Sequence, residues 1–176
     1  MTDNSRETSI ASVLAAALET GRLAVGTVAG PCWRSFPAAA ESVAWARRFT
    51  ESVLAEVADV DAEHVGDVVL VVSELITNAV REVAKLAPAS DGARPVHLGV
   101  GVHDRWTHLY AVDTAPAMPK EAHRGPLAGS GRGIPIIKAL AAMTWVEQAE
   151  HGKTIHVLMT RTGVELTPED RQTLMP

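Results

Sequence analysis

The sequence predicts an α+β fold, a two-layer α/β sandwich in which a mixed, mostly antiparallel sheet is covered on one face by helices. Between Pro37 and Leu86, apolar residues recur every three or four positions, which is typical of two long amphipathic helices. From Val96 the apolar period shortens to two, which is typical of half-buried strands. Helices that come first and hairpins that come later, with one helix between them, favour a sheet with a single helical layer.

The helical half of the chain follows from local signals. Residues 33–36 are predicted to form a short strand, and Pro37 then leads into a long helix that ends before Asp59. The apolar stripe of this helix consists of Val43, Ala46, Phe49, Val53 and Val57. A second helix is predicted over residues 62–86, followed by a loop from Pro88 to Pro95. Its stripe consists of Val65, Val68, Val69, Val72, Leu75, Ile76, Ala79, Val80 and Val83.

The strands of the second half alternate apolar and other residues. Val96, Leu98, Val100 and Val102 alternate with His97, Gly99, Gly101 and His103. A turn at residues 104–105 leads to a second strand, residues 106–113, which Pro116 and Pro119 stop. A helix is predicted over residues 133–143, and residues 144–148 and 154–160 are predicted to form a closing hairpin through His151-Gly152.

Length and composition indicate one core with extensions. The chain has 176 residues, and we expect an N-terminal extension over residues 1–30, a domain over 31–162 and a tail over 163–176. A net charge of -5 without runs of like charge argues against nucleic-acid binding. Cys32 is the single cysteine, in agreement with a reducing compartment. The apolar run Ile10 to Leu18, predicted to be a short helix, is too short for a membrane span, so we expect a cytoplasmic protein.

Two polar residues in the second helix indicate a site. Glu74 and Asn78 are four residues apart, so they lie on the same helical face, just off the apolar stripe. Taken alone, the pair is more typical of a solvated face on an ordinary amphipathic helix. Other segments must therefore decide between a site and a solvated surface.

Three further motifs follow along the chain. Asp113 lies where a buried strand breaks into a loop, a place where aspartate also forms Asx-turns and helix caps. Gly129, Gly131 and Gly133 alternate immediately before a helix, where glycine allows close approach of a ligand and free N–H groups favour phosphate, although linkers have similar glycines. The pattern matches neither the dinucleotide fingerprint nor the P-loop. Gly152-Lys153-Thr154 begins the last strand and would, alone, be a plausible turn.

In their order and spacing, these four segments resemble the Bergerat-fold ATPases, which include DNA gyrase, the 90 kDa heat-shock chaperone, sensor histidine kinases and mismatch-repair ATPases. The chain is most similar to bacterial anti-sigma-factor serine kinases and to the stand-alone ATP-binding regulators of actinomycetes. V-S-E-L-I-T-N-A-V-R, residues 72–81, resembles their N box, and G-R-G-I-P-I-I-K-A-L, residues 131–140, resembles their second glycine box. Residues 145–154 resemble the closing W…G-K-T segment. The resemblance covers roughly residues 33–159.

The resemblance implies a set of roles around Mg²⁺-ATP. Asn78 would ligate Mg²⁺ through its amide oxygen, a hard ligand for a hard cation. Asp113 would accept a hydrogen bond from the adenine amino group, a charge-assisted contact of about 1.5–3 kcal/mol. Thr154 would support the adenine contact directly or through water. Glu74 would be the general base for a partner's serine hydroxyl, a role worth about 10²–10⁴ in rate.

The glycines and the partners complete what the resemblance implies. Gly129, Gly131 and Gly133 would let the lid and the helix N-terminus wrap the phosphates. The partners would be an anti-sigma antagonist of the STAS type, a sigma factor or both, and the chain could form a homodimer. No nucleic acid or membrane partner is expected.

The sequence departs from the family pattern at two places. In most of the superfamily, glycines follow the aspartate, but here Asp113 is followed by Thr114, Ala115 and Pro116, a variant that also occurs in the actinomycete proteins. Pro135 stands in or just after the first turn of the phosphate-facing helix, where a missing N–H is tolerated.

Three hypotheses follow. The first is an ATP-dependent serine/threonine kinase of the anti-sigma type, which Glu74 favours. The second is a non-catalytic ATP-sensing interaction module, which the altered segment after Asp113 favours. The third is a degenerate scaffold without ATP. A histidine metal site is not expected, because His97 and His103 are six residues apart on one strand.

Overall fold

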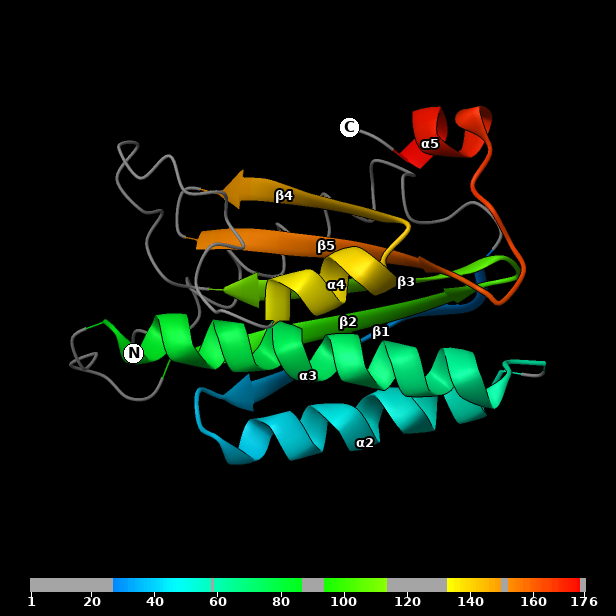
Figure 1. Cartoon of the computed structure of the whole chain (residues 1–176). Coiled ribbons are helices and arrows are strands. Elements are labelled where there is room, and N and C mark those ends of the chain that lie inside the picture. Colours follow the sequence, from blue (N-terminus) through cyan, green and yellow to red (C-terminus); the bar gives the residue numbers. More distant parts are fainter. Residues whose placement is uncertain (1–26, 58, 87–93, 114–132, 150–151, 175–176) are drawn as a thin grey trace.

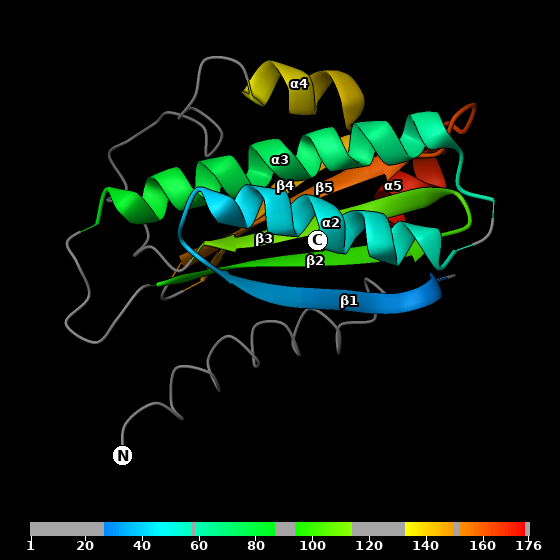
Figure 2. The same ribbon diagram turned by 90° about the horizontal axis from the view of Figure 1, so that it is seen from below.

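The computed structural model describes residues 27–57, 59–86, 94–113, 133–149 and 152–174. A five-stranded sheet has the order β1-β2-β3-β5-β4, and every pairing between these strands is antiparallel. The strands are β1 (Thr27–Pro37), β2 (Pro95–His103), β3 (Trp106–Asp113), β4 (Met143–Ala149) and β5 (Gly152–Thr160). Three helices lie on one face of the sheet: α2 (Glu41–Ala55), α3 (Ala62–Ala84) and α4 (Gly133–Leu140) (Figures 1 and 2). The predicted α+β sandwich is therefore confirmed, with an entirely antiparallel sheet.

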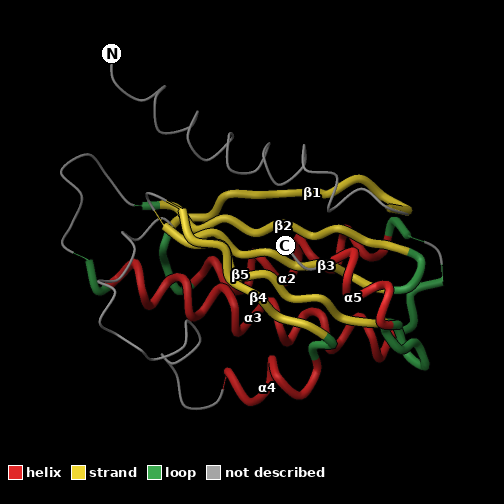
Figure 3. Tube along the Cα trace, turned by 90° about the horizontal axis from the view of Figure 1, so that it is seen from above, coloured by secondary structure: helices red, strands yellow, loops and turns green. Residues whose placement is uncertain are grey.

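The main core is formed by residues of the sheet and of the helices, which Figure 3 shows from above as two layers. All four alternating apolar residues of β2 are fully buried, because they face the helical layer. From α3, the buried residues are His64, Val68, Val69, Val71, Val72, Leu75, Ile76, Ala79 and Val83. The predicted stripe is confirmed except that Val65 and Val80 are half-buried, and Val71 was not predicted to belong to it.

The start of α3 has a specific cap. The Asp61 carboxylate accepts a hydrogen bond from the His64 backbone N–H at 2.8 Å, which satisfies one of the free donors of the first turn. Within the described residues, neither α3 nor any other helix is long and apolar enough to cross a membrane.

Most element boundaries agree with the sequence prediction to within about two residues, and the larger differences lie in three places. Strand β1 begins at Thr27, earlier than residue 33. Helix α4 ends at Leu140 and β4 begins at Met143, because the Ala142 N–H donates to the Leu158 carbonyl and Met143 pairs with Leu158 on β5. The tail also forms a helix that was not predicted, α5 (Pro168–Leu174). The predicted helix over residues 10–18 lies outside the described residues.

Helix α5 begins with a reciprocal cap that ties it to the sheet. The Thr167 backbone N–H and hydroxyl both donate to Asp170 Oδ2, and the Asp170 N–H donates to the Thr167 hydroxyl. Arg105, in the turn between β2 and β3, donates to the other Asp170 oxygen at 2.8 Å. The cap hydrogen bonds, first among the causes, lower the pKa of Asp170. The T-P-E-D sequence was a capping signal that could have predicted this helix.

The opposite face of the sheet, here called the outer face, carries a buried layer of aromatic and histidine side chains. The rings of Trp145 and His156 are stacked with their centroids 4.7 Å apart, and His108 Nε2 lies 3.1 Å from His156 Nδ1. His156 Nε2 is 3.6 Å from Glu147 Oε2. Burial lowers the pKa of His108 well below its usual value and that of His156 to about 4. Both imidazoles are therefore neutral at pH 7.

We expect stability to fall as the pH drops from about 6.5 through 4. In this range the unfolded chain binds protons at these histidines while the native chain does not, so protons favour unfolding. His156 alone would account for about 3 kcal/mol over the range, whereas above pH 6.5 it adds no pH dependence. Urea unfolding of the wild type and His156→Gln at pH 7, 5.5 and 4.5 measures the effect. Equal losses of stability in the two proteins would contradict the prediction.

Candidate functional site

Helix α3 places Glu74 and Asn78 at the border of its buried stripe. Both side chains are half-buried, and they lie on the same flank as the fully buried Val71, since residues 71, 74 and 78 are separated by three and four positions. Val69 and Val80 lie on the other flank. The pair therefore lies between buried core and solvent, as the sequence predicted.

This flank is the one next to α4. Helix α3 lies between α2 and α4 and packs against both of them (Figure 2). Because an α-helix is right-handed and α3 runs in the direction shown in Figure 1, the flank of Val71 and Asn78 turns toward α4 and the flank of Val69 turns toward α2. Glu74 and Asn78 thus border the space between α3 and α4.

Several chain segments meet at one end of the domain. Strand β3 ends there at Asp113, β5 begins there at Gly152, and the C-terminal half of α3 extends to the same end (Figures 1 and 2). Helix α4 also points its first residue, Gly133, toward this end. The structure therefore brings four of the predicted segments together although they are far apart in the sequence.

The strand register separates two of the predicted residues. Position 113 is directly opposite Val96 on β2 and Lys153 on β5, and directly opposed residues share a face of the sheet. Asp113 and Lys153 thus occupy positions on the helix-covered face, because Val96 belongs to the main core. Thr154 is opposite Val112 and Glu147 and lies buried on the outer face. The register does not bring Thr154 together with the other predicted residues.

Lys153 is the residue that sequence reasoning missed. It is half-buried and occupies the helix-facing position directly across from Asp113. The sequence did contain a signal for this position. Ile155, Val157 and Met159 all belong to the main core, and residue 153, two positions before Ile155, faces the same side of the sheet.

Of the three glycines in the predicted motif, the structure describes only Gly133. Gly133 is the first residue of α4, and Gly129 and Gly131 lie outside the described residues. Pro135 is exposed in the first turn of α4, where its missing N–H removes no intrahelical hydrogen bond. The other N–H groups of this turn and the helix dipole favour an anion.

Cationic groups stand near the polar pair. Arg81 Nη1 lies 3.4 Å from Asn78 Oδ1, one helical turn further along α3. With Lys153 on β5, the arrangement can contact an anion, while the Asn78 amide oxygen is of the kind that ligates Mg²⁺. Among the described residues, no group of three or more His, Cys, Asp and Glu could hold a metal ion.

Comparison with known proteins decides the family. Residues 36–159 match the model of the histidine kinase-like ATPase domain, which is more than half of the chain. The chain belongs to this family. The match begins at Phe36 in β1 and ends at Met159 in β5, so it contains the whole helical layer and all the predicted site residues of this ATPase domain.

Solved structures agree on the fold. Among those that match is the crystal structure of the RsbU and RsbW domains of Rv1364c from Mycobacterium tuberculosis, with a TM-score of 0.53 and 18% sequence identity. The match covers 79% of this chain and 34% of that chain, so the ATPase domain described here spans about a third of the length of its structural neighbour. No curated protein matches the sequence.

Proposed function

We propose that this protein binds ATP with Mg²⁺ and transfers the γ-phosphoryl group to a serine or threonine of an anti-sigma antagonist. The observation that carries the proposal is the position of Glu74 and Asn78 on the α4 flank of α3, toward the end of the domain where β3 ends and α4 begins. The chain belongs to the histidine kinase-like ATPase domain family. This arrangement would offer one carboxylate and one amide oxygen at a nucleotide site.

In this proposal each residue has a distinct chemical task. The Asn78 amide oxygen would be a ligand for Mg²⁺, and Arg81 beside it would face the negative charge of the phosphates. Asp113 would accept a hydrogen bond from the adenine amino group and so select against guanine, which has a carbonyl there. Gly133 and the first turn of α4 would donate N–H groups to phosphate oxygens, with Gly129 and Gly131 in the adjoining segment.

Glu74 would act on the partner's hydroxyl. It lies one turn before Asn78 on the same flank, so a serine entering between α3 and α4 would meet its carboxylate beside the phosphates. There it would orient the hydroxyl and accept its proton as the oxygen attacks phosphorus. Mg²⁺ would supply charge neutralisation on the phosphate oxygens.

Replacing Asn78 with alanine is expected to weaken Mg²⁺-dependent ATP binding roughly tenfold, the loss of about 1.4 kcal/mol from one ligand contact with a charged group. ATP binding in EDTA should change much less, because Asn78 acts through the metal. Isothermal titration with and without Mg²⁺ measures both values. Thr77→Ala, half-buried like Asn78 but on a different flank of the same turn, is the matched control. Equal weakening with and without Mg²⁺ would contradict the assignment.

A second candidate function is a non-catalytic ATP-sensing module whose nucleotide state controls a sigma factor or another partner. The sequence after Asp113 favours it, because Thr114-Ala115-Pro116 stands where most relatives have glycines that bend around the base. Incubation with labelled ATP and the antagonist separates the two: tight binding without phosphoserine would leave only the module. Failure to bind Mg²⁺-ATP would contradict both the kinase and the ATP-sensing module, and a degenerate scaffold would remain.

A further inference from the structure

A groove lies between the edge strand β1 and helix α2, and none of the predicted nucleotide-binding residues lines it. It has a volume of about 490 Å³ and is lined by Arg34, Ser35, Phe36, Pro37, Trp45, Arg48, Phe49 and Ser52. The four α2 residues are spaced by three, one and three positions, so they form one stripe along the helix. The groove therefore runs between this stripe and the last residues of β1.

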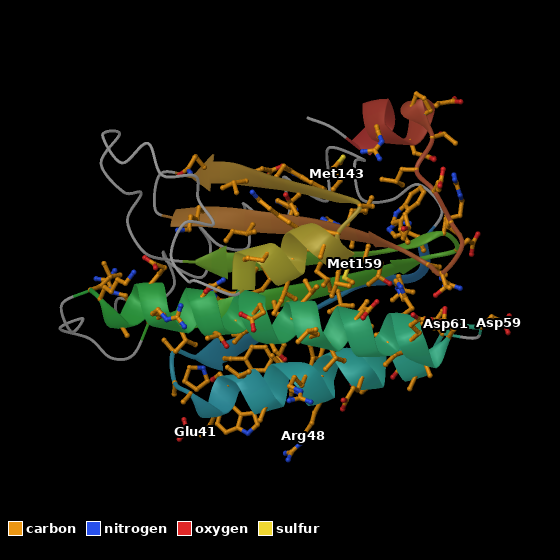
Figure 4. The ribbon with its side chains drawn as sticks, viewed as in Figure 1. Glu41, Arg48, Asp59, Asp61, Met143 and Met159 are labelled. Carbon is orange, nitrogen blue, oxygen red and sulfur yellow. The ribbon has the colours of Figure 1, made fainter. Side chains whose placement is uncertain are left out.

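The lining combines aromatic surface with positive charge. Trp45 is 45% exposed. Phe49 is half-buried, and the Arg34 guanidinium lies over its ring, 6.0 Å from the ring centroid. Arg48 projects outward from the free side of α2 (Figure 4). In the part of the chain that the structure describes, neither Arg34 nor Arg48 forms an ion pair. Two cations that form no ion pair with a described residue thus stand beside exposed apolar surface, in a chain whose net charge is -5.

Strand β1 adds an open sheet edge to this groove. It is the outermost strand, and its pairing with β2 is regular from Cys32 to Pro37, with irregular register before Cys32. An edge strand presents unpaired N–H and C=O groups to which another extended chain can bind. Among the described residues, no strand pairs with the outer edge of β1, and its stretch from Trp33 to Pro37, five residues or roughly 17 Å, matches a short extended peptide.

We propose that this groove binds an extended acidic segment of a partner protein, which adds to β1 as a sixth strand. Side chains of a strand alternate between faces, so every second residue of the segment would turn toward α2. Carboxylates at such positions would meet Arg34 and Arg48, and an aromatic side chain between them would cover Trp45 and Phe49. Binding is independent of the nucleotide site and requires no ATP.

A labelled nine-residue peptide tests the proposal on the full-length protein without ATP. It carries Asp, Phe and Glu at alternate central positions separated by threonines, and fluorescence anisotropy measures its binding. We expect a Kd below about 1 mM at low salt, weakening as salt screens the charges. Reversal of both cations, Arg34→Glu with Arg48→Glu, should weaken binding at least about tenfold. A peptide with lysines in place of the acids should not bind.

The matched control is Arg47→Glu, compared with Arg48→Glu alone, because it makes the same single charge reversal on an exposed residue of α2 that does not line the groove. Unchanged binding in Arg47→Glu, with loss in Arg48→Glu and in the double variant, supports the groove. Equal loss in the two single variants would show non-specific attraction and overturn the proposal, as would no binding by the wild type at 1 mM. Sedimentation supplies the remaining outcome: a dimer that the double variant dissociates would assign the groove to a second copy of the chain and overturn the acidic partner.

Discussion

Glu74→Gln is expected to lower the rate of phosphoryl transfer to the antagonist by about 10²–10⁴, the usual contribution of a general base. Glutamine has nearly the same shape but cannot accept the serine proton. The Kd for Mg²⁺-ATP should stay within about twofold, because the proposed metal ligand, Asn78, is unchanged. The loss would thus appear in turnover and not in nucleotide affinity. Single-turnover transfer from labelled ATP, with titration of Mg²⁺-ATP alongside, measures the two quantities.

The control for this prediction is Glu63→Gln, the same change in the first turn of the same helix, where the side chain is exposed. It should transfer phosphate at the wild-type rate. A wild-type rate in Glu74→Gln would show that another group takes the proton. A parallel loss of ATP affinity would instead place Glu74 among the nucleotide-binding residues.

The sequence predicted the layers well because their signals are local. The stripe of α3 depends only on which residues meet the core, and burial in the structure confirms most of it. The apolar residues of β2 face the core as predicted, but the strand is not half-buried, because the residues that alternate with them are buried on the outer face as well. The end of α4 could not be predicted in the same way. Ala141 and Ala142 continue a helical pattern, and only the hydrogen bond from Ala142 to Leu158 and the pairing of Met143 draw the chain into the sheet.

The site was predicted in part for the same reason. Glu74 and Asn78 follow from helical spacing within one element, and their shared flank is found in the structure. Whether Lys153 or Thr154 faces the helical layer depends on how β5 pairs with β3, since a shift of one residue exchanges the two faces of the strand. A motif comparison identifies the Gly152-Lys153-Thr154 segment, whereas the strand register determines which of its side chains faces the helical layer.

Gly99→Ala is expected to destabilise the fold by about 3 kcal/mol, at the upper end for overpacking a core. Gly99 lies directly opposite Tyr110, whose ring covers it: a Cβ at this position would be 1.8 Å from Tyr110 Cζ and 2.2 Å from Cε1. Tyr110 is 3% exposed and has His108 and His156 beside it, so the ring cannot move without disturbing the outer face. The midpoint of thermal unfolding should fall by roughly 6–12 °C.

Two comparisons separate this steric effect from a general cost of removing glycine. Gly66→Ala in α3, where a Cβ meets nothing within 4 Å, should raise stability by about 0.5–1 kcal/mol through helix propensity. In a Tyr110→Ala background, Gly99→Ala should cost little, because the ring that it would strike is gone; the double-mutant cycle then gives a large coupling energy between the two positions. Additive losses would mean that the ring and the glycine act independently. In that case Gly99 would be needed for the backbone of β2 and not for the packing of Tyr110, and other residues would determine how the buried histidines of the outer face pack.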